Sequence, residues 1–337
     1  MDNEIMVSIV CIAYNHEPYI RDCLEGFVNQ KTNFKYEVII HDDASTDKTA
    51  DIIREYEKKY PDIIKPIYQK ENQYSQGVKF GKKYIYPKLR GKYVAWCEGD
   101  DYWCDDTKLQ QQVDALEAHP NAAICTHIVQ SVTENNEPVD EFFPSIPIPE
   151  VIESKDYTAL LLNENSYHFQ TSCYLMRISM MREVIAREVE FLELAPVGDW
   201  PLQLFLSTKG DLCFINKLMS CYRRNVVGSW SSRIKRDQSV KINYRRRMIE
   251  ALESFNRYTE GEFSDLVKKE ILFHEFHLHL LEGNSNALLE KQYRDLYKAK
   301  LSHVERMYYF LDAKAPFVIK LYNEYAKNHK QKTKSAN

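Results

Sequence analysis

The sequence predicts an α/β fold, with a mostly parallel sheet flanked by helices and a helical C-terminal region. Two observations carry this prediction. Continuous apolar runs alternate with helix-like patterns over the first 130 residues, and such alternation is typical of βαβ units. Beyond Asp237 the pattern is almost wholly helical and rich in tyrosine. The length of 337 residues leaves room for one large domain or two ordinary ones.

The strands expected in the first part of the chain are short apolar runs. Met6–Ala13 is a continuous apolar run, as in a strand of a parallel sheet that is buried on both faces. Similar runs predict strands over Tyr36–Ile40, Ile63–Tyr68, Tyr93–Cys97 and Ala122–Val129.

Helical patterns lie between these runs. Glu17 and Pro18 begin the first helix, because proline is tolerated in a first turn. Ser45 or Thr46 can cap a second helix that runs to about Tyr60. Two further segments have helical spacing, Gln76–Pro87 and Thr107–His119.

The pattern changes after residue 132. Four prolines between Thr133 and Ser154 predict a long loop. Regular elements then return. We expect a helix over Lys155–Leu162, a strand over Thr171–Arg177, a helix ending near Glu190, a helix after Asp199 and a strand over Asp211–Tyr222.

The composition excludes several classes of protein. Apolar residues make up 44% of the chain, and no run approaches the ~18 residues of a membrane span. The N-terminus is acidic and lacks a basic and apolar leader, so we expect no secretory signal. The eight cysteines form no CxxC pair, which argues against a zinc ribbon and fits buried thiols in a reducing compartment. We therefore expect a cytoplasmic location.

Charge is distributed unevenly along the chain. From Arg233 to the end there are 21 basic and 14 acidic residues, against 24 basic and 35 acidic residues before it. This asymmetry predicts two parts with different partners. The basic part can meet a membrane surface or a polyanion, or it can be an ordinary solvated helical face.

Three carboxylates, Glu98, Asp100 and Asp101, directly follow the predicted strand Tyr93–Cys97. Ligands of an open parallel sheet bind outside the carboxyl ends of its strands. Clustered carboxylates repel one another unless a positive group lies between them. This cluster therefore fits a hard divalent cation with an anionic ligand such as a nucleotide diphosphate. The alternative is an exposed acidic turn.

A second polar cluster follows the strand Tyr36–Ile40. Asp42 or Asp43 can accept a hydrogen bond from the N3–H of a uracil-type base, although helix capping and a turn also fit this segment. After the first strand, Tyr14 can stack on a base and Asn15 adds polar groups, unless Tyr14 is an ordinary surface aromatic. Parallel strands bring these ends together at one edge of the sheet.

These motifs together resemble the GT-A glycosyltransferases of family 2. VSIVCIAYN (Val7–Asn15) is similar to the first strand and turn of that family, and HDDASTDKT (His41–Thr49) to its DDGSTD signature. EGDDYW (Glu98–Trp103) is similar to its DxD segment. The match is good over about residues 5–130 and looser to about Ser232, through VGDWPL and YRRNVVGSWS.

The resemblance implies a GT-A fold and an inverting transferase that uses a nucleoside-diphosphate sugar, most often UDP-linked. It implies that Tyr14 and Asp42 contact the base, with Asn15 and Asp43 close by. Glu98 would face the ribose or the metal shell.

The resemblance also assigns the metal and the base. Asp100, with Asp101 beside it, would bind Mn²⁺ or Mg²⁺ through the diphosphate. Asp199 falls on the family position of the general base that deprotonates the acceptor hydroxyl. An alternative for Asp199 is an acid that stabilises a helix start.

The sequence departs from the family pattern at four positions. Ile12 replaces a proline, Glu98 replaces the first acid of DxD, Gly198 replaces a glutamate, and Asn225 replaces a histidine that can approach the metal. A metal-ligand role for Asn225 is therefore in doubt.

Cations and acceptor-side residues complete the candidate site. Arg223 and Arg224 can bind the diphosphate bidentately, and Lys70 can reach a phosphate or base, with simple surface cations as the alternative. The candidate acceptor-side residues are Trp103, His168, Gln170 and Trp200. The two tryptophans could instead belong to the core.

The resemblance implies a catalytic domain over 1–232, with a nucleotide-binding half (1–130) and an acceptor-side half (131–232), before a helical region over 233–337. It implies hexosyl or N-acetylhexosaminyl transfer to a glycan or lipid-linked acceptor in cell-surface polysaccharide synthesis. The helical region could contact the inner face of the membrane peripherally or form a homo-oligomer. No nucleic-acid motif accompanies its charge.

Two other functions fit parts of the sequence. A sugar-phosphate nucleotidyltransferase also uses a parallel sheet and a metal, but the first turn, AYNHEPY, lacks a glycine-rich phosphate loop. A non-catalytic subunit that binds a sugar nucleotide or a glycan fits the departures at Gly198 and Asn225.

Overall fold

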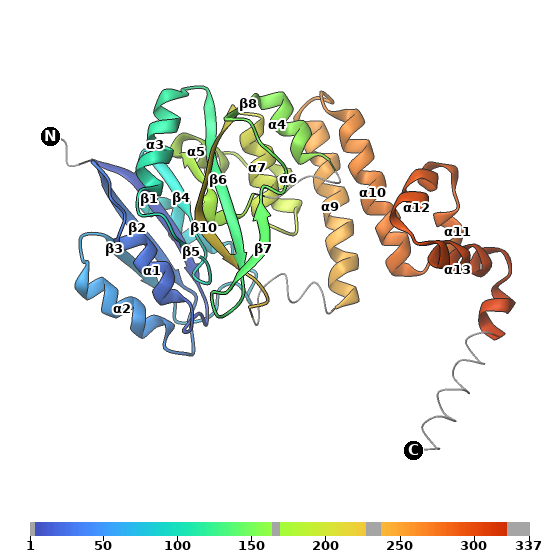
Figure 1. The fold of residues 1–337 in the computed structure, drawn as a ribbon, viewed down its shortest axis with the longest axis horizontal. Helices are drawn as coiled ribbons and strands as arrows, with labels where there is room; N and C mark the ends of the chain where they lie inside the picture. The colour runs from blue at the N-terminus through green and yellow to red at the C-terminus, as the bar shows by residue number, and fades with distance from the viewer. Residues whose placement is uncertain (1–3, 164–168, 227–236, 322–337) are drawn as a thin grey trace, which may run out of the picture. The chain divides into compact units, whose positions relative to one another are not determined.

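The structure is a computed structural model that describes residues 4–163, 169–226 and 237–321. Contacts divide the chain into two compact units (Figure 1). The first unit comprises residues 1–193 and 197–232, and the second comprises residues 194–196 and 233–337. The predicted α/β fold class is confirmed for the first unit, and the predicted helical character for the described part of the second.

One sheet runs through the first unit, in the order β3-β2-β1-β4-β9-β6-β10-β5. The strands along this path are β3 (Ile64–Tyr68), β2 (Lys35–Asp42), β1 (Ile5–Ala13), β4 (Tyr93–Trp96), β9 (Leu175–Arg177), β6 (Ala122–Val132), β10 (Asp211–Arg223) and β5 (Tyr102–Trp103). The first four are parallel. Their carboxyl ends therefore meet at one edge of the sheet.

Register places the predicted site residues at that edge. Ala13 pairs with Asp42, and Asp42 pairs with Tyr68 on the other side. Tyr14 and Asp43 therefore leave the sheet at the same level. The backbone N–H of Gly99, just after β4, donates to the carbonyl of Ile12 at 2.9 Å, which brings the acid loop to the same edge.

Helices cover the sheet. The helices of the first unit are α1 (Ile20–Val28), α2 (Thr49–Lys59), α3 (Lys108–Ala118), α4 (Ser154–Leu161), α5 (Ile178–Ala186), α6 (Glu190–Leu194, which ends at the boundary with the second unit) and α7 (Asp199–Ser207). Ile20, Leu24 and Phe27 recur at helical spacing and are fully buried in the core that α1 forms with the sheet. Ile53 of α2 and Leu109 of α3 join the same core.

Two local predictions differ from the structure. The expected loop after Thr133 contains two strands, β7 (Pro138–Phe143), which pairs with β6, and β8 (Val151–Ile152), which pairs with β10. Pro138 is the first residue of β7, a position where the missing N–H costs little. The expected strand Thr171–Arg177 opens with a 3-10 turn (Thr171–Cys173), and its strand β9 is antiparallel to β4 and β6.

The helical predictions also need two corrections. Neither Ser45 nor Thr46 caps α2. Oδ1 of Asp47 accepts from the N–H of Thr49 at 2.9 Å instead. The segment expected to be helical over Gln76–Pro87 holds only a π turn (Gly81–Ile85) and the start of a 3-10 turn (Tyr86–Lys88).

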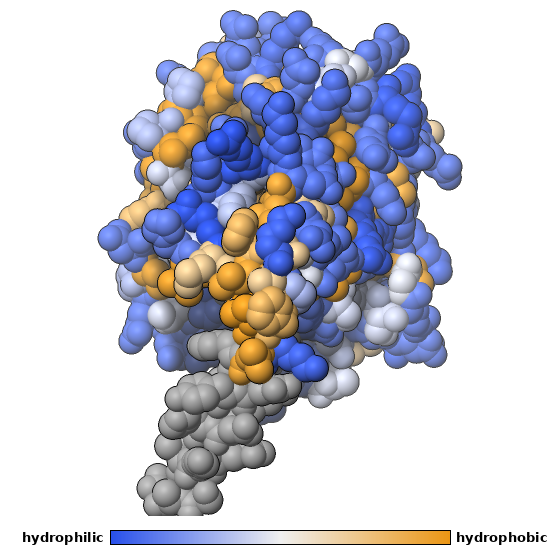
Figure 2. All heavy atoms as spheres, turned by 90° about the vertical axis from the view of Figure 1, so that its right-hand side faces the viewer, coloured by the Kyte–Doolittle hydropathy of each residue, from blue (hydrophilic) through white to orange (hydrophobic). Residues whose placement is uncertain are grey.

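The second unit is helical. Its helices are α9 (Gln238–Tyr258), α10 (Ser264–Glu282), α11 (Ser285–Leu288), α12 (Arg294–Lys300) and α13 (His303–Lys314). Phe276, Leu288 and Tyr293 form a small core. Apolar side chains also gather on an outer surface of this unit (Figure 2). None of the helices in the described ranges is long and apolar enough to cross a membrane.

Candidate active site

The acid loop, residues 98–101, joins β4 to β5. Gly99 is required by a close approach, because a Cβ at this position would stand 2.8 Å from Nδ1 of His16. The N–H of Asp101 donates to the carbonyl of Glu98 at 3.0 Å and closes the turn. The loop therefore presents three carboxylates within one tight bend.

Asp199 approaches this loop from a different part of the chain. It is the first residue of α7, and its Oδ1 accepts from the N–H of Trp200 at 2.8 Å. The Glu98 carboxylate reaches solvent but has protein on most sides, and this burial, Asp100 and Asp199 raise the pKa of Glu98 to about 8. The structure thus brings both Asp100 and Asp199 within electrostatic reach of Glu98.

Asp101 faces inward. Its side chain is buried, and its Oδ1 accepts from the backbone N–H of Arg223 at 2.8 Å. Burial and the charges of Asp100 and Glu98 raise the pKa of Asp101, which the Arg223 N–H partly offsets. One of the two predicted metal carboxylates is therefore engaged by the protein.

Arg223 is also buried, and its side chain links several elements of the first unit. Its guanidinium donates to Oδ2 of Asp22 at 2.9 Å and to Oδ1 of Asn136 and the carbonyl of Asp100. The guanidinium also lies over the ring of Tyr19, 4.6 Å from its centroid. These contacts join α1, the turn before β7, the acid loop and the end of β10.

The neighbouring arginine is engaged as well. Arg224 pairs with Glu141 at 3.2 Å. Both arginines that were predicted to contact the diphosphate therefore bind carboxylates of the protein in this structure.

The end of β2 holds two acids in different settings. Asp42 is buried, and its Oδ1 has no hydrogen-bond partner. Burial raises the pKa of Asp42, although Ser45 hydrogen-bonds to it and lowers the value. Asp43 instead uses both oxygens, which accept from the N–H groups of Gln73 at 2.8 Å and Tyr74 at 3.0 Å. Asp42 therefore keeps a free acceptor, and Asp43 orders the loop after β3.

The first turn is built in a similar way. Asn15 adopts a positive φ of 56°, its Oδ1 accepts from the N–H of Thr46 at 2.8 Å, and its own N–H donates to Ser45 at 2.9 Å. Tyr14, the preceding residue, is 43% exposed at this edge. Lys70 is exposed. Tyr14 thus remains available to a ligand, whereas the Asn15 side chain holds two loops together.

The predicted acceptor-side residues do not form one surface. Trp103 is buried, donates to the carbonyl of Ser172 at 2.9 Å and lies under the ammonium of Lys108. Trp200 is buried too and donates to the carbonyl of Leu161 at 3.2 Å. Stacking of sugars on these tryptophans is therefore corrected to core packing. Gln170 is half-buried, and His168 lies outside the described residues.

Sequence reasoning missed the partners that hold the site. Asp22 and Asn136 gave no signal, because each is an ordinary polar residue until the fold brings it to Arg223. Lys108 is fully buried, and burial lowers its pKa to about 8 while its ammonium donates to Gln112 at 2.7 Å. Its burial beneath the helix could not be foreseen from an amphipathic pattern that places lysine outside.

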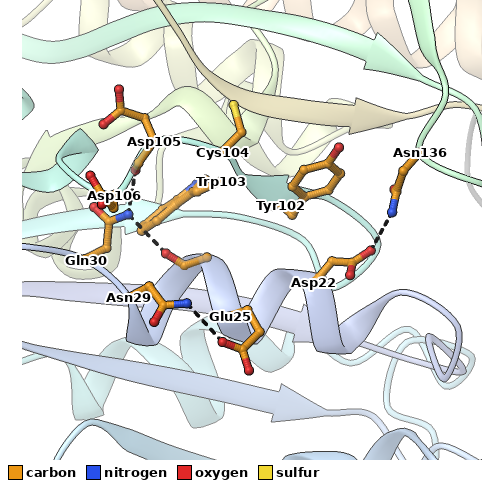
Figure 3. A pocket seen from close by; sticks show the side chains of 11 residues that line it. Asp22, Glu25, Asn29, Gln30, Tyr102, Trp103, Cys104, Asp105, Asp106 and Asn136 are labelled. Carbon is orange, nitrogen blue, oxygen red and sulfur yellow. Dashed lines mark hydrogen bonds between the residues drawn. The ribbon is translucent and has the colours of Figure 1, made fainter.

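A separate pocket of about 340 Å³ lies beside α1 (Figure 3). Its lining includes Asp22, Glu25, Tyr102, Asp105 and Asn136. Trp103, a predicted acceptor-side residue, also lines it, whereas none of the predicted nucleotide or metal residues does.

The carboxylates of the acid loop are the candidate ligands of a metal ion. In the part of the chain that the structure describes, no three His, Cys, Asp or Glu side chains are arranged to hold a metal ion. The outward-facing carboxylates of Glu98 and Asp100 repel each other, which fits a site that a cation would neutralise. Mg²⁺ is commonly held by one or two carboxylates together with substrate phosphates.

A sheet with parallel strand ends that carry a free aspartate, an exposed tyrosine and a group of carboxylates is the architecture of the GT-A glycosyltransferases. The chain belongs to glycosyl transferase family 2, because the model of that family matches residues 8–185. The resemblance expected from the sequence is thereby confirmed, as is the assignment to a family of glycosyltransferases.

Related proteins were found by sequence. Protein Rv1520 of Mycobacterium tuberculosis H37Rv is 37% identical over 226 residues, which cover 67% of this chain and 61% of the relative. The Escherichia coli enzyme named UDP-Glc:alpha-D-GlcNAc-diphosphoundecaprenol beta-1,3-glucosyltransferase WfaP is 34% identical over 112 residues, or 33% of this chain and 41% of that one. The chain thus spans less than two thirds of the length of these relatives.

Solved structures share the fold. TarS of S. aureus (residues 1–349) aligns with a TM-score of 0.59 at 16% identity, over 92% of this chain and 81% of that one. A mannosyltransferase of Pyrobaculum calidifontis, solved with GDP-Man and Mn²⁺, aligns with a TM-score of 0.52 at 13% identity, over 93% and 88%. TarS has also been solved with UDP-GlcNAc, and that structure aligns with a TM-score of 0.52 at 14% identity, over 82% and 81%.

Proposed function

We propose that the protein is a metal-dependent inverting glycosyltransferase that moves a sugar from a UDP-linked donor to a glycan or lipid-linked acceptor. The observation that carries this proposal is that Asp199, at the start of α7, lies within electrostatic reach of Glu98 in the acid loop, at the carboxyl ends of the parallel strands. Such an edge is where open α/β sheets bind their ligands.

Asp199 is the general base of the proposed reaction. The acceptor hydroxyl oxygen attacks the anomeric carbon as the bond from that carbon to the diphosphate oxygen breaks. The hydroxyl proton passes to the Asp199 carboxylate. Inversion follows from a single displacement, and no covalent nucleophile is required.

Asp42 and Tyr14 hold the base of the donor. The free Oδ1 of buried Asp42 would accept from the N3–H of uracil, and Tyr14 would stack on the ring. The UDP-GlcNAc complex of TarS supports a UDP-linked donor by analogy of fold. Asn15 and Asp43 then act by ordering the loops on either side.

Asp100 would hold the cation, and Glu98 would face the ribose or the metal shell. A divalent cation bound there would offset the charge that develops on the departing diphosphate. Asp101, the second predicted metal residue, would contribute by fixing the loop, since one of its oxygens already accepts from Arg223. To contact the phosphates, Arg223 and Arg224 would first have to leave the carboxylates that they bind. The side chain of Lys70 would have to move toward the donor.

The remaining predictions concern context. The lipid-linked acceptor in the name of WfaP supports a role in cell-surface polysaccharide synthesis. Residues 1–232 would form the catalytic domain and residues 233–337 a separate helical region. Cytoplasmic location, homo-oligomerisation and Gln170 and His168 as acceptor-side residues stay predictions.

Release of UDP tests the proposed function. The full chain is incubated with UDP-sugars, GDP-sugars and Mn²⁺, with and without glycan acceptors, and free nucleotide is measured. We expect UDP release that increases with an acceptor. Pyrophosphate release from UTP and a sugar phosphate would establish the nucleotidyltransferase alternative. Binding of UDP-sugars without turnover on any acceptor would favour the non-catalytic subunit.

A further inference from the structure

The second unit ends in an apolar surface that faces solvent. We call it the α13 face, and it is formed by large apolar side chains that are between 36% and 71% exposed: Val304, Met307, Tyr308, Phe310, Phe317, Val318 and Leu321. Figure 2 shows hydrophobic side chains gathered on this side of the molecule. Contiguous apolar surfaces of this kind mark interaction sites on soluble proteins.

On α13 itself, this face is the side of the helix that would ordinarily be buried. Val304, Met307, Tyr308 and Leu311 follow the i, i+3, i+4, i+7 spacing of a core-facing stripe. The inner contacts of the helix come from its other side. Tyr309 packs on the small core, and the carbonyl of Arg306 accepts from the hydroxyl of Tyr297. One side of the helix therefore packs against its unit, and the apolar stripe on the other side is exposed to solvent.

Charge distinguishes between possible partners of this surface. Residues 303–321 contain two acids, Glu305, which bonds to Ser302 in a capping box, and Asp312, which accepts from Ser285 at 2.5 Å, and both bonds leave the negative charge in place. The cations in the same range are Arg306, Lys314 and Lys320. The sequence that follows contains four more lysines, Lys327, Lys330, Lys332 and Lys334, and one acid, Glu324.

This combination fits an anionic bilayer better than a second copy of the chain. Apolar side chains beside lysines and arginines are characteristic of segments that lie in a membrane interface. Each such cation near an anionic surface is attracted to it, and long lysine side chains can reach the headgroups while their stems stay apolar. Two copies meeting through this face would instead bring like charges together.

We propose that the α13 face binds peripherally to membranes that contain anionic lipids. The apolar side chains would enter the boundary between headgroups and acyl chains, and the lysines would contact the headgroups. Because part of the attraction would be electrostatic, the contact would be weakened by salt. The proposal goes beyond the transfer reaction, so binding can be measured without any substrate.

Sedimentation with vesicles tests the proposal on the full chain. Vesicles of phosphatidylcholine with phosphatidylglycerol are compared with phosphatidylcholine alone, at low and high salt. We expect binding to the anionic vesicles that falls as salt rises. Met307→Ser with Phe310→Ser should weaken it by roughly tenfold or more, because each buried apolar side chain contributes substantially. Replacing the four tail lysines with glutamine should weaken it as well.

The control variant is Ile146→Ser, which removes an exposed apolar side chain from the first unit. It should bind vesicles like the unmodified chain, and circular dichroism should show that all variants are folded. The proposal is overturned if the chain fails to bind anionic vesicles, or if the double variant binds as well as the control. It is also overturned if the double variant changes only the molar mass by light scattering, since the face would then join two copies.

Discussion

The backbone N–H of Arg223 donates to Oδ1 of Asp101 at 2.8 Å, so the end of β10 fixes the loop that carries the site carboxylates. The side chain of the same arginine reaches back to Asp22 on α1. Residues more than a hundred positions apart therefore set where Asp100 and Glu98 stand. The geometry of the proposed metal site therefore depends on the contacts of Arg223 as well as on the acid loop.

Replacement of the buried Arg223 should destabilise the protein more than replacement of the neighbouring Arg224. Arg223→Ala removes the hydrogen bonds of the guanidinium to Asp22, Asn136 and the carbonyl of Asp100. Because Asp22 is 41% exposed, we expect a loss of about 1.5–3 kcal/mol, the range for hydrogen bonds to charged groups. Arg224→Ala is a matched control, because Arg224 is half-exposed and pairs with Glu141 at the surface, where such pairs contribute about 0–1 kcal/mol. Urea denaturation measures both. Equal losses in the two variants would show that the contacts of Arg223 stabilise the protein no more than those of Arg224.

Asp199→Asn should abolish transfer while leaving the donor bound. An amide cannot accept the acceptor proton, and loss of a general base typically lowers kcat by about 10²–10⁴-fold. Steady-state transfer kinetics and UDP binding by calorimetry measure the two effects separately.

The control for this substitution is Asp156→Asn. Asp156 also lies in the first turn of its helix, α4, but is not part of the site. It should lose any stability that comes from the helix dipole and keep its activity. If both variants keep wild-type turnover, Asp199 is only a helix-start acid.

Asp42→Asn should change which nucleotide the protein binds more tightly, UDP or CDP. In the proposed site the carboxylate would accept from the N3–H of uracil, whereas an amide can also donate to the N3 of cytosine. Loss of a hydrogen bond to a charged group costs about 1.5–3 kcal/mol, so UDP affinity should fall roughly tenfold to a hundredfold relative to CDP. Competition calorimetry with UDP and CDP gives the ratio. Asp51→Asn, at an exposed position on α2, should leave it unchanged.

Stability should fall as pH rises because of Glu98. Its pKa in the folded protein is raised to about 8, above the ordinary value of a glutamate, so the folded state holds a proton that the unfolded state has lost. The loss of stability should accumulate between about pH 4.5 and 8. Since the side chain reaches solvent, the effect is on the order of 1 kcal/mol.

Thermal unfolding across this pH range measures that effect. Glu98→Gln should flatten the dependence, and Mn²⁺ with UDP should oppose it, because a bound cation favours the ionised carboxylate. If Glu98→Gln keeps the full dependence of stability on pH, a group other than Glu98 is responsible for it.

The parallel part of the fold follows from local sequence. Met6–Ala13 is buried on both faces of a sheet and therefore reads as a continuous apolar run, and its strand is confirmed as β1. The polar residues after each strand could be placed at one edge because parallel strands end together. The sequence alone therefore places Tyr14, Asp42 and Glu98 at one edge of the sheet.

The partners inside the site could not be predicted in the same way. Whether Asp43 or Asp42 keeps a free oxygen depends on the amides of Gln73 and Tyr74, which the loop after β3 supplies. The burial of Trp103 depends on Ser172, which is 69 positions away in the chain, and on Lys108, which folds back over the ring from the start of α3. Such choices are decided by tertiary contacts that leave no local pattern.

The effect of Mn²⁺ on UDP binding tests the central claim most directly. Calorimetry would compare the unmodified chain with Asp100→Asn, and with Asp106→Asn as a control, since Asp106 pairs with Lys31 at the surface. We predict that Mn²⁺ tightens UDP binding to the unmodified chain and the control, and that Asp100→Asn loses this gain while keeping its affinity for UDP alone. Binding that ignores Mn²⁺ in the unmodified chain, or an undiminished gain in Asp100→Asn, would contradict the account.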